Sequence, residues 1–110
     1  MQKSIVTVWE SDQAQQLVEA LLSIEKPKTM QNFLRDVMTE KEIIEISARL
    51  EAARMLTTGE TYTAITKKTK LSSRTVARIS DWLKDGCDGY QAVIKSVNAH
   101  HAHMPPVRAE

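Results

Sequence analysis

Side chains suited to contacts with nucleic acid are concentrated between residues 61 and 84. Six of them are basic and one is acidic: Lys67, Lys68, Lys70, Arg74, Arg78 and Lys84, against Asp81. The whole chain has a formal net charge of only +1, so the remainder is slightly acidic. Cations gathered in one short stretch of a nearly neutral chain are the electrostatic pattern of a surface that contacts phosphates.

Two arginines in this stretch have the spacing to read DNA bases. Arg74 and Arg78 are four residues apart, so a helix would place both on one face. In the major groove, an arginine can donate two hydrogen bonds to O6 and N7 of one guanine. The expected phosphate contacts are the hydroxyls beside these arginines and the lysines before them: Ser72, Ser73, Thr75, Lys67, Lys68 and Lys70.

The apolar residues around these side chains predict a helix-turn-helix over about residues 61–83, with helices at about 61–69 and 73–83. Such a motif packs two short helices through a few buried side chains. Lys70 stands in the turn where glycine is usual, and a lysine with positive φ costs about 1 kcal/mol, unless the turn has another geometry. The expected buried set is Tyr62, Ile65, Leu71, Val76 and Ile79.

Further helices are predicted on both sides of the motif. Ser11 can cap a first helix that ends at Lys26-Pro27, because the residue before a proline is pushed out of the helical region. Thr29 can cap a second helix. After Asp85-Gly86, Asp88 can cap a last helix, whose apolar face is Tyr90, Val93, Ile94 and Val97. We expect one helical domain over residues 11–97, with an N-terminal arm at 1–10 and a flexible tail at 98–110.

The third predicted helix is the longest and the most apolar. It begins at a capping box, in which Thr39 and Glu42 bond to each other's backbone amides, and Gly59 ends it in a left-handed conformation after about Leu56. Its apolar residues cover far more than one stripe, so other helices must surround it. In so short a chain, a second subunit can supply some of them.

Composition and motifs exclude several other classes of protein. The single cysteine, Cys87, permits no intramolecular disulfide, and the sequence has neither a signal-peptide pattern nor a long apolar run, so we expect a cytoplasmic protein. It has no glycine-rich phosphate loop, zinc signature or nucleophile motif. We read His100, His101 and His103 as part of an uninvolved tail. The prediction is therefore a protein that is not an enzyme, with no metal and no cofactor.

Residues 46–97 resemble the Trp repressor superfamily, and most closely its YerC/YecD branch. The most specific part is the run Arg-Leu-Glu-Ala-Ala-Arg-Met-Leu at 49–56, followed by Gly59 and Tyr62. The resemblance implies an all-α fold of about six helices and an intertwined homodimer. It also implies that two recognition helices read half-sites about one DNA turn apart.

The resemblance also bears on a ligand, because Trp repressors bind L-tryptophan between the core and the recognition helix. Arg49, Thr75 and Arg78 match positions of that pocket. Ile79 and Trp82 stand where the family has a smaller glycine and serine, so we expect them to fill the pocket. Arg49 has another role open to it, since it can pair with Glu45 one turn earlier.

These observations predict a sequence-specific transcriptional regulator that binds double-stranded DNA as a homodimer and does not respond to tryptophan. Two alternatives stay open. The basic motif can instead contact an acidic protein, which would make the chain a protein-interaction adaptor. The regulator can also be controlled by another small-molecule co-regulator.

Overall fold

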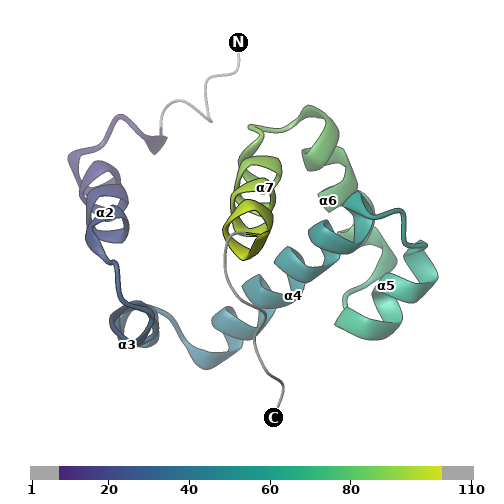
Figure 1. Cartoon of the computed structure of the whole chain (residues 1–110), viewed down its shortest axis with the longest axis horizontal. Helices are drawn as coiled ribbons and strands as arrows, with labels where there is room; N and C mark the ends of the chain where they lie inside the picture. Colours follow the sequence, from purple (N-terminus) through teal and green to yellow (C-terminus); the bar gives the residue numbers. More distant parts are fainter. Residues whose placement is uncertain (1–7, 103–110) are drawn as a thin grey trace. The chain divides into compact units, whose positions relative to one another are not determined.

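The computed structural model describes residues 8–102, and these residues form helices and connecting turns without a strand (Figure 1). The all-α prediction with about six helices is therefore confirmed. None of the helices within this range is long and apolar enough to cross a membrane. In chain order they are α2 (Asp12–Ser23), α3 (Pro27–Val37), α4 (Glu40–Thr57), α5 (Tyr62–Thr69), α6 (Ser73–Asp85) and α7 (Gly89–Ala102).

The chain divides into two compact units, Met1–Ile43 and Ile44–Glu110. The first unit contains α2 and α3. The second contains most of α4 and all of α5, α6 and α7.

The two helices of the first unit begin at sequence signals of different kinds. Ser11 caps α2 as predicted, because its Oγ accepts a hydrogen bond of 3.0 Å from the Ala14 amide. The prediction that Thr29 starts the next helix was wrong, since α3 starts at Pro27. A proline at the first helical position loses no hydrogen bond and already has helical φ. Pro27 therefore starts a helix, and α2 has already ended at Ser23.

Both ends of α4 follow the local signals in the sequence. The capping box is present: the Thr39 amide donates to Glu42 Oε1 at 2.9 Å, and the Glu42 amide donates to Thr39 Oγ1 at 3.1 Å. After the helix, Gly59 has φ +83°, and the Glu60 amide donates to the Met55 carbonyl at 3.1 Å. Glycine adopts this left-handed conformation without the clash that a Cβ would cause.

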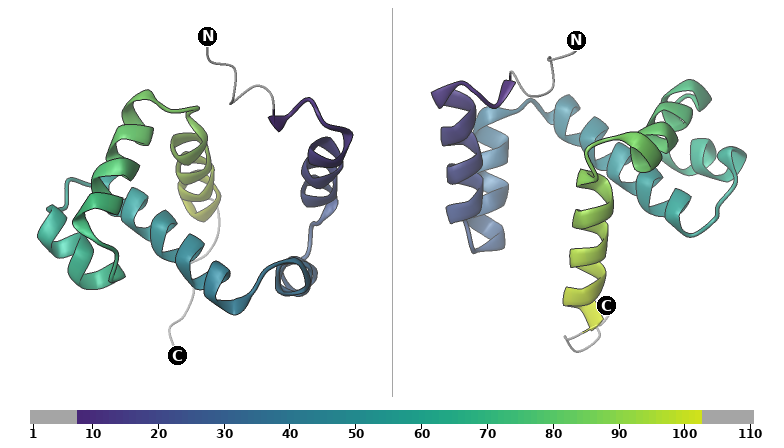
Figure 2. Two further views of the ribbon diagram at one scale, coloured as in Figure 1. Left: turned by 180° about the vertical axis from the view of Figure 1, so that it is seen from behind. Right: turned by 90° about the horizontal axis from the view of Figure 1, so that it is seen from above.

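The core belongs to the second unit, and among the described residues it consists of apolar side chains only. In both views of Figure 2, α5 and α6 lie together near the end of α4, and α7 lies on the side of α6 away from α5. The second half of α4 supplies three of the core residues, and the other three helices supply the rest. The buried set is Ala52, Ala53, Met55, Ile65, Val76, Ile79, Leu83 and Ile94.

The last helix is longer than its apolar face predicts. Asp88 was expected to cap it, but Asp88 has the left-handed φ of +68° and its side chain forms no cap hydrogen bond within the described residues. The helix α7 continues five residues beyond Val97, so residues 98–102 of the predicted tail are helical. Alanine and histidine are tolerated in a helix even where they add no apolar face. Residues 103–110 of the predicted tail, with His103, and residues 1–7 of the predicted arm lie outside the described residues.

Candidate nucleic-acid interface

α5 and α6 form the helix-turn-helix that the sequence predicts, joined by residues 70–72. Ile65, Val76 and Ile79 are completely buried, and Leu71 in the turn packs against them. Tyr62 is exposed instead of buried, because it is the first residue of α5, one turn before the helix reaches the core. The apolar packing therefore fixes the two helices to each other through their inner faces.

Hydroxyl caps start both helices of the motif. Thr61 Oγ1 accepts a hydrogen bond of 3.1 Å from the Ala64 amide at the start of α5. At the start of α6, Ser72 Oγ accepts from the Thr75 amide at 3.1 Å and donates to Thr75 Oγ1 at 3.0 Å. Ser73, the first residue of α6, is exposed. The Ser72 hydroxyl is thus engaged in capping, a role that was not predicted for it.

Lys70 turns the chain between the two helices. It has φ +66° and ψ 12°, which is the left-handed conformation that glycine usually provides at this point. Its amide donates to the Thr66 carbonyl at 2.9 Å and so closes the last turn of α5. The strain of this conformation is about 1 kcal/mol for a residue with a Cβ. Its ammonium group is carried on the exposed side of the turn.

The cations of the motif fall into two groups. Five of them, Lys67, Lys70, Arg74, Arg78 and Lys84, are exposed and form no ion pair within residues 8–102. Lys68 differs, because its Nζ lies 3.3 Å from Glu51 Oε2 on α4. The predicted base-reading pair on α6 is therefore free, whereas one of the predicted phosphate contacts is directed to a carboxylate.

Glu51 is the centre of this ion-pair cluster. Arg54 holds both of its oxygens, with Nη2 at 2.8 Å from Oε2 and Nε at 3.1 Å from Oε1. The hydrogen bond from Arg54 lowers the pKa of Glu51; partial burial opposes this change, and Lys68 supports it. Sequence spacing of three could have indicated the pair with Arg54. Nothing in the sequence indicated Lys68 as the third member, since it is on another helix.

The residues matched to a ligand pocket are arranged as follows. Arg49 pairs with Glu45 at 2.8 Å, the alternative expected from their spacing, although Arg49 Nε is buried without a hydrogen-bond partner. Ile79 belongs to the core and Trp82 is 41% exposed. Arg78 is exposed and Thr75 is half-buried. Ile79 therefore leaves no accessible surface for a ligand at its position.

Tyr90 was predicted only as part of an apolar face, but in the structure both burial and a nearby charge act on the pKa of its hydroxyl. It packs against the core, and this burial raises the pKa of its hydroxyl, while the nearby charge of Arg49 lowers it. The influence of the Arg49 charge on Tyr90 could not be predicted from spacing, because 41 positions of sequence separate the two residues.

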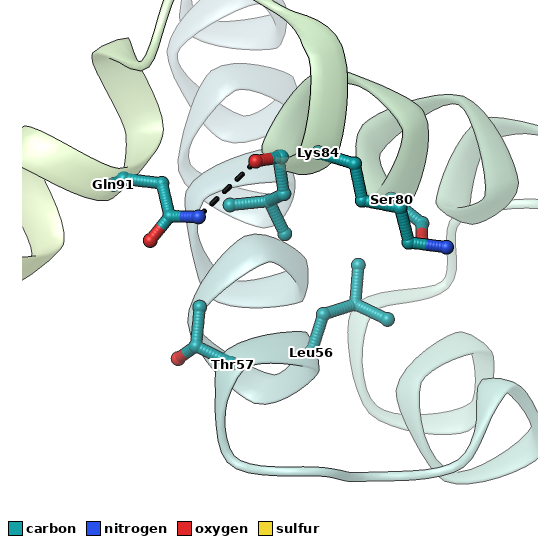
Figure 3. A pocket seen from close by; sticks show the side chains of 6 residues that line it. Leu56, Thr57, Ser80, Lys84 and Gln91 are labelled. Atoms are coloured by element: carbon teal, nitrogen blue, oxygen red, sulfur yellow. Dashed lines mark hydrogen bonds between the residues drawn. The ribbon is translucent and has the colours of Figure 1, made fainter.

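A cavity of about 480 Å³ lies on the flank of α6, between α4 and α7 (Figure 3). Its polar wall includes Gln91, whose Nε2 donates to the Leu83 carbonyl at 3.1 Å. The cavity combines an apolar floor with one ammonium group, and its six lining residues are Leu56, Thr57, Ser80, Leu83, Lys84 and Gln91.

No group of three or more His, Cys, Asp or Glu residues in the described part of the chain is arranged to hold a metal ion. Cys87 is exposed, which rules out a buried thiol at this position. The free groups that the motif offers are therefore hydroxyls, ammonium groups and guanidinium groups, which are donors for an anionic partner.

Comparisons with known proteins place this arrangement among similar chains. The family model of the Trp repressor protein matches residues 12–98. YerC of Bacillus subtilis (strain 168), which is described as uncharacterized, is 35% identical over 82 residues, or 74% of this chain and 79% of YerC. A TrpR-like protein from Eubacterium eligens ATCC 27750 has a crystal structure with a TM-score of 0.80 and 34% identity, covering 84% of this chain and 95% of that one.

A second solved structure agrees with the first. It is a protein from Staphylococcus aureus, described provisionally as a Trp repressor, with a TM-score of 0.76 and 30% identity. The similarity covers 80% of this chain and 88% of that one. The helices on both sides of the motif are therefore part of the shared fold, in addition to the motif itself.

Proposed function

The chain belongs to the Trp repressor family, and from this premise we propose that it is a sequence-specific DNA-binding transcriptional regulator. The family consists of regulators that are not enzymes. One observation carries the proposal: a helix-turn-helix with a fully apolar interior presents five cations that have no ion pair in the described residues. Free cations on a fixed helix pair are what a phosphate backbone requires.

We assign different roles to the exposed groups of this motif. Arg74 and Arg78 on α6 read base edges in the major groove, where each can bind a guanine through two hydrogen bonds. Ser73 and Thr75 contact phosphates at the start of the helix, where free amides and hydroxyls meet. Lys67 and Lys70 provide the salt-dependent part of the affinity.

We further propose that the regulator acts as a homodimer. Three apolar residues in the first part of α4, Ile44, Ile46 and Leu50, are exposed in the single chain. Because α4 is buried only in its second half, a partner subunit can cover the remainder. Two copies would present two α6 helices to half-sites about one helical turn of DNA apart.

The decisive test is selection of genomic DNA fragments by the purified protein, followed by titration of the best fragment with variants. We expect Arg74→Ala and Arg78→Ala each to weaken binding to that fragment by about 10-fold or more, since one bidentate contact is worth about 1–3 kcal/mol. Lys95→Ala on α7 removes an exposed cation outside the motif and is the matched control. Unchanged affinity in both arginine variants would refute α6 as the reader.

A protein-interaction adaptor remains the alternative from another class. It shares the basic surface, but it predicts no binding to duplex DNA even at low salt. Binding to random duplex with a steep dependence on salt supports the regulator, and its complete absence supports the adaptor.

The cavity beside α6 favours one variant of the main proposal, a regulator with a small-molecule co-regulator other than tryptophan. It has the volume for a small ligand and lies against the proposed reading helix. We propose that tryptophan itself is not bound, because Ile79 is fully buried. Calorimetry with millimolar L-tryptophan tests this point, and a saturable heat would contradict it.

A further inference from the structure

Lys68 is the one cation of the helix-turn-helix that the described structure joins to an acid, and the acid belongs to α4 instead of the motif. We propose that Glu51 limits the affinity of the DNA interface, because it withholds Lys68 from the phosphates of DNA of any sequence. This inference rests on the proposed DNA-binding function and concerns how tightly, and with what dependence on salt, the protein binds DNA.

The geometry shows a carboxylate that is already held in place on its own helix. Arg54 is three residues after Glu51 and contacts both carboxylate oxygens. Lys68 Nζ, from the last turn of α5, reaches the oxygen that also accepts from Arg54 Nη2. Within residues 8–102 no other ion pair joins two helices, since the pair between Arg49 and Glu45 lies inside α4.

The fixed carboxylate distinguishes this cluster from an isolated pair on the surface, because Arg54 already holds both oxygens of Glu51. The Glu51 side chain is 28% exposed, whereas that of Lys68 is 63% exposed. Isolated ion pairs on a surface contribute little to stability, partly because both side chains lose entropy when they pair. Here the bidentate arginine already holds the carboxylate, so less side-chain entropy is lost when Lys68 pairs with it. The same arginine holds the pKa of Glu51 below its ordinary value, so the carboxylate is ionised at neutral pH.

The consequence for DNA binding follows from counting cations. Each phosphate neutralised by a lysine adds about 0.9 to the slope of log affinity against log salt concentration. A lysine that is paired with a carboxylate adds nothing to this slope, and the carboxylate itself repels nearby phosphates. Random DNA is bound through phosphates alone, while an operator is also bound through its bases. Removing one phosphate contact weakens binding to both by about the same factor, so Glu51 lowers the overall affinity for DNA and its dependence on salt.

The test is a double-mutant cycle on the full chain. Affinity for a random-sequence duplex and for the selected operator fragment is measured between about 50 and 200 mM salt. The variants are Glu51→Gln, Lys68→Gln and the double variant. Lys67→Gln is the control for a free lysine on the same helix turn. Glu60→Gln is the control for net charge, since Glu60 is exposed and forms no ion pair in the described chain.

We expect Lys68→Gln alone to leave the salt slope unchanged, and Lys67→Gln to reduce it by about 0.9. Glu51→Gln should increase the slope by about 0.9 and strengthen binding to random duplex several-fold more than Glu60→Gln does. The double variant should return to the slope of the wild type, because the released lysine is then absent. A thermal melt of each variant checks that the fold is kept.

Three results would overturn the inference. If Lys68→Gln reduces the slope as much as Lys67→Gln, Lys68 already contacts phosphates. If Glu51→Gln and Glu60→Gln act alike, the effect is one of net charge. If the two changes of the cycle are additive while the wild type binds DNA, the inference fails and the proposed function stands. A wild type that binds no duplex at low salt refutes both.

Discussion

The two compact units of the chain differ in what they bury. The second unit has an eight-residue apolar core around which its helix-turn-helix is built. In the first unit, α2 and α3 contain no buried residue, although each has an apolar face. Leu22 on α2 is 78% exposed. Short helices that bury no apolar side chain are only marginally stable in water, because nothing offsets the conformational entropy lost when they form. The second unit therefore positions the helix-turn-helix with its own core, whereas the apolar faces of α2 and α3 need a further surface to cover them.

The core of the second unit offers the sharpest test of this difference. Ile79→Ala removes a completely buried side chain at the α6 face of the core, so the free energy of unfolding should fall by about 2–5 kcal/mol. Urea denaturation followed by circular dichroism measures the change. Leu22→Ala on α2 is the matched control, and at low protein concentration it should cost well under 1 kcal/mol. Equal losses in the two variants would contradict the comparison.

A charged substitution on the apolar face of α2 should weaken the proposed homodimer and should change the stability of the first unit itself much less. Leu17→Glu places a carboxylate on the apolar face of α2, which we propose a partner subunit covers. The dimer should weaken by about 10-fold or more, because covering one leucine is worth about 1.5–3 kcal/mol. Sedimentation over a range of concentrations measures this shift. Gln16→Glu makes the same charge change on the polar face and should leave the mass distribution unaltered.

Signals that act within one turn of helix allowed much of this fold to be predicted. The caps at Ser11 and Thr39 and the left-handed end at Gly59 depend on neighbouring backbone groups only. Pro27 was misread because a proline can end one helix or begin another, and the sequence around it did not decide between the two. Periodicity identified the inner face of the helix-turn-helix, which the core confirms at Ile65 and Val76.

What could not be predicted depends on residues far apart in the sequence. Periodicity shows that a face is apolar but does not show what covers it: Leu22 and Ile44 are on helices with apolar periodicity and are exposed. A free lysine and a paired lysine have the same sequence context: Lys67 and Lys68 are adjacent, and only the second meets Glu51. The roles of the DNA-binding residues stay predictions, because the structure fixes their exposure and not their partners.

The turn of the motif provides a smaller test within the second unit. Lys70→Gly should stabilise the fold by up to about 1 kcal/mol, because glycine adopts φ +66° without strain. A higher melting temperature is the expected observation. Affinity for random duplex should fall at the same time, since a phosphate contact is lost. Lys67→Gly is the control, because it introduces glycine inside α5 and should destabilise the helix by about 1 kcal/mol.

The smallest effect concerns the ion-pair cluster that joins α4 to α5. The pKa of Glu51 is lowered in the folded state from its ordinary value, chiefly by its hydrogen bond with Arg54. A lowered pKa means that the carboxylate contributes stability above its unfolded pKa and loses that contribution as pH falls through the folded pKa. Glu51→Gln should therefore be less stable than the wild type at pH 7, by a few tenths of a kcal/mol for so exposed a cluster.

This difference should shrink and then vanish as pH falls through the lowered pKa of folded Glu51, where the wild-type carboxyl also becomes neutral. Urea unfolding of the two proteins at several pH values between about 3 and 7 measures it. Glu60→Gln is measured in parallel to remove the effect of net charge. A difference that stays constant over this range would mean that the lost stability comes from packing of the side chain. The ion pair between Glu51 on α4 and Lys68 on α5 would then contribute nothing to the stability of the second unit.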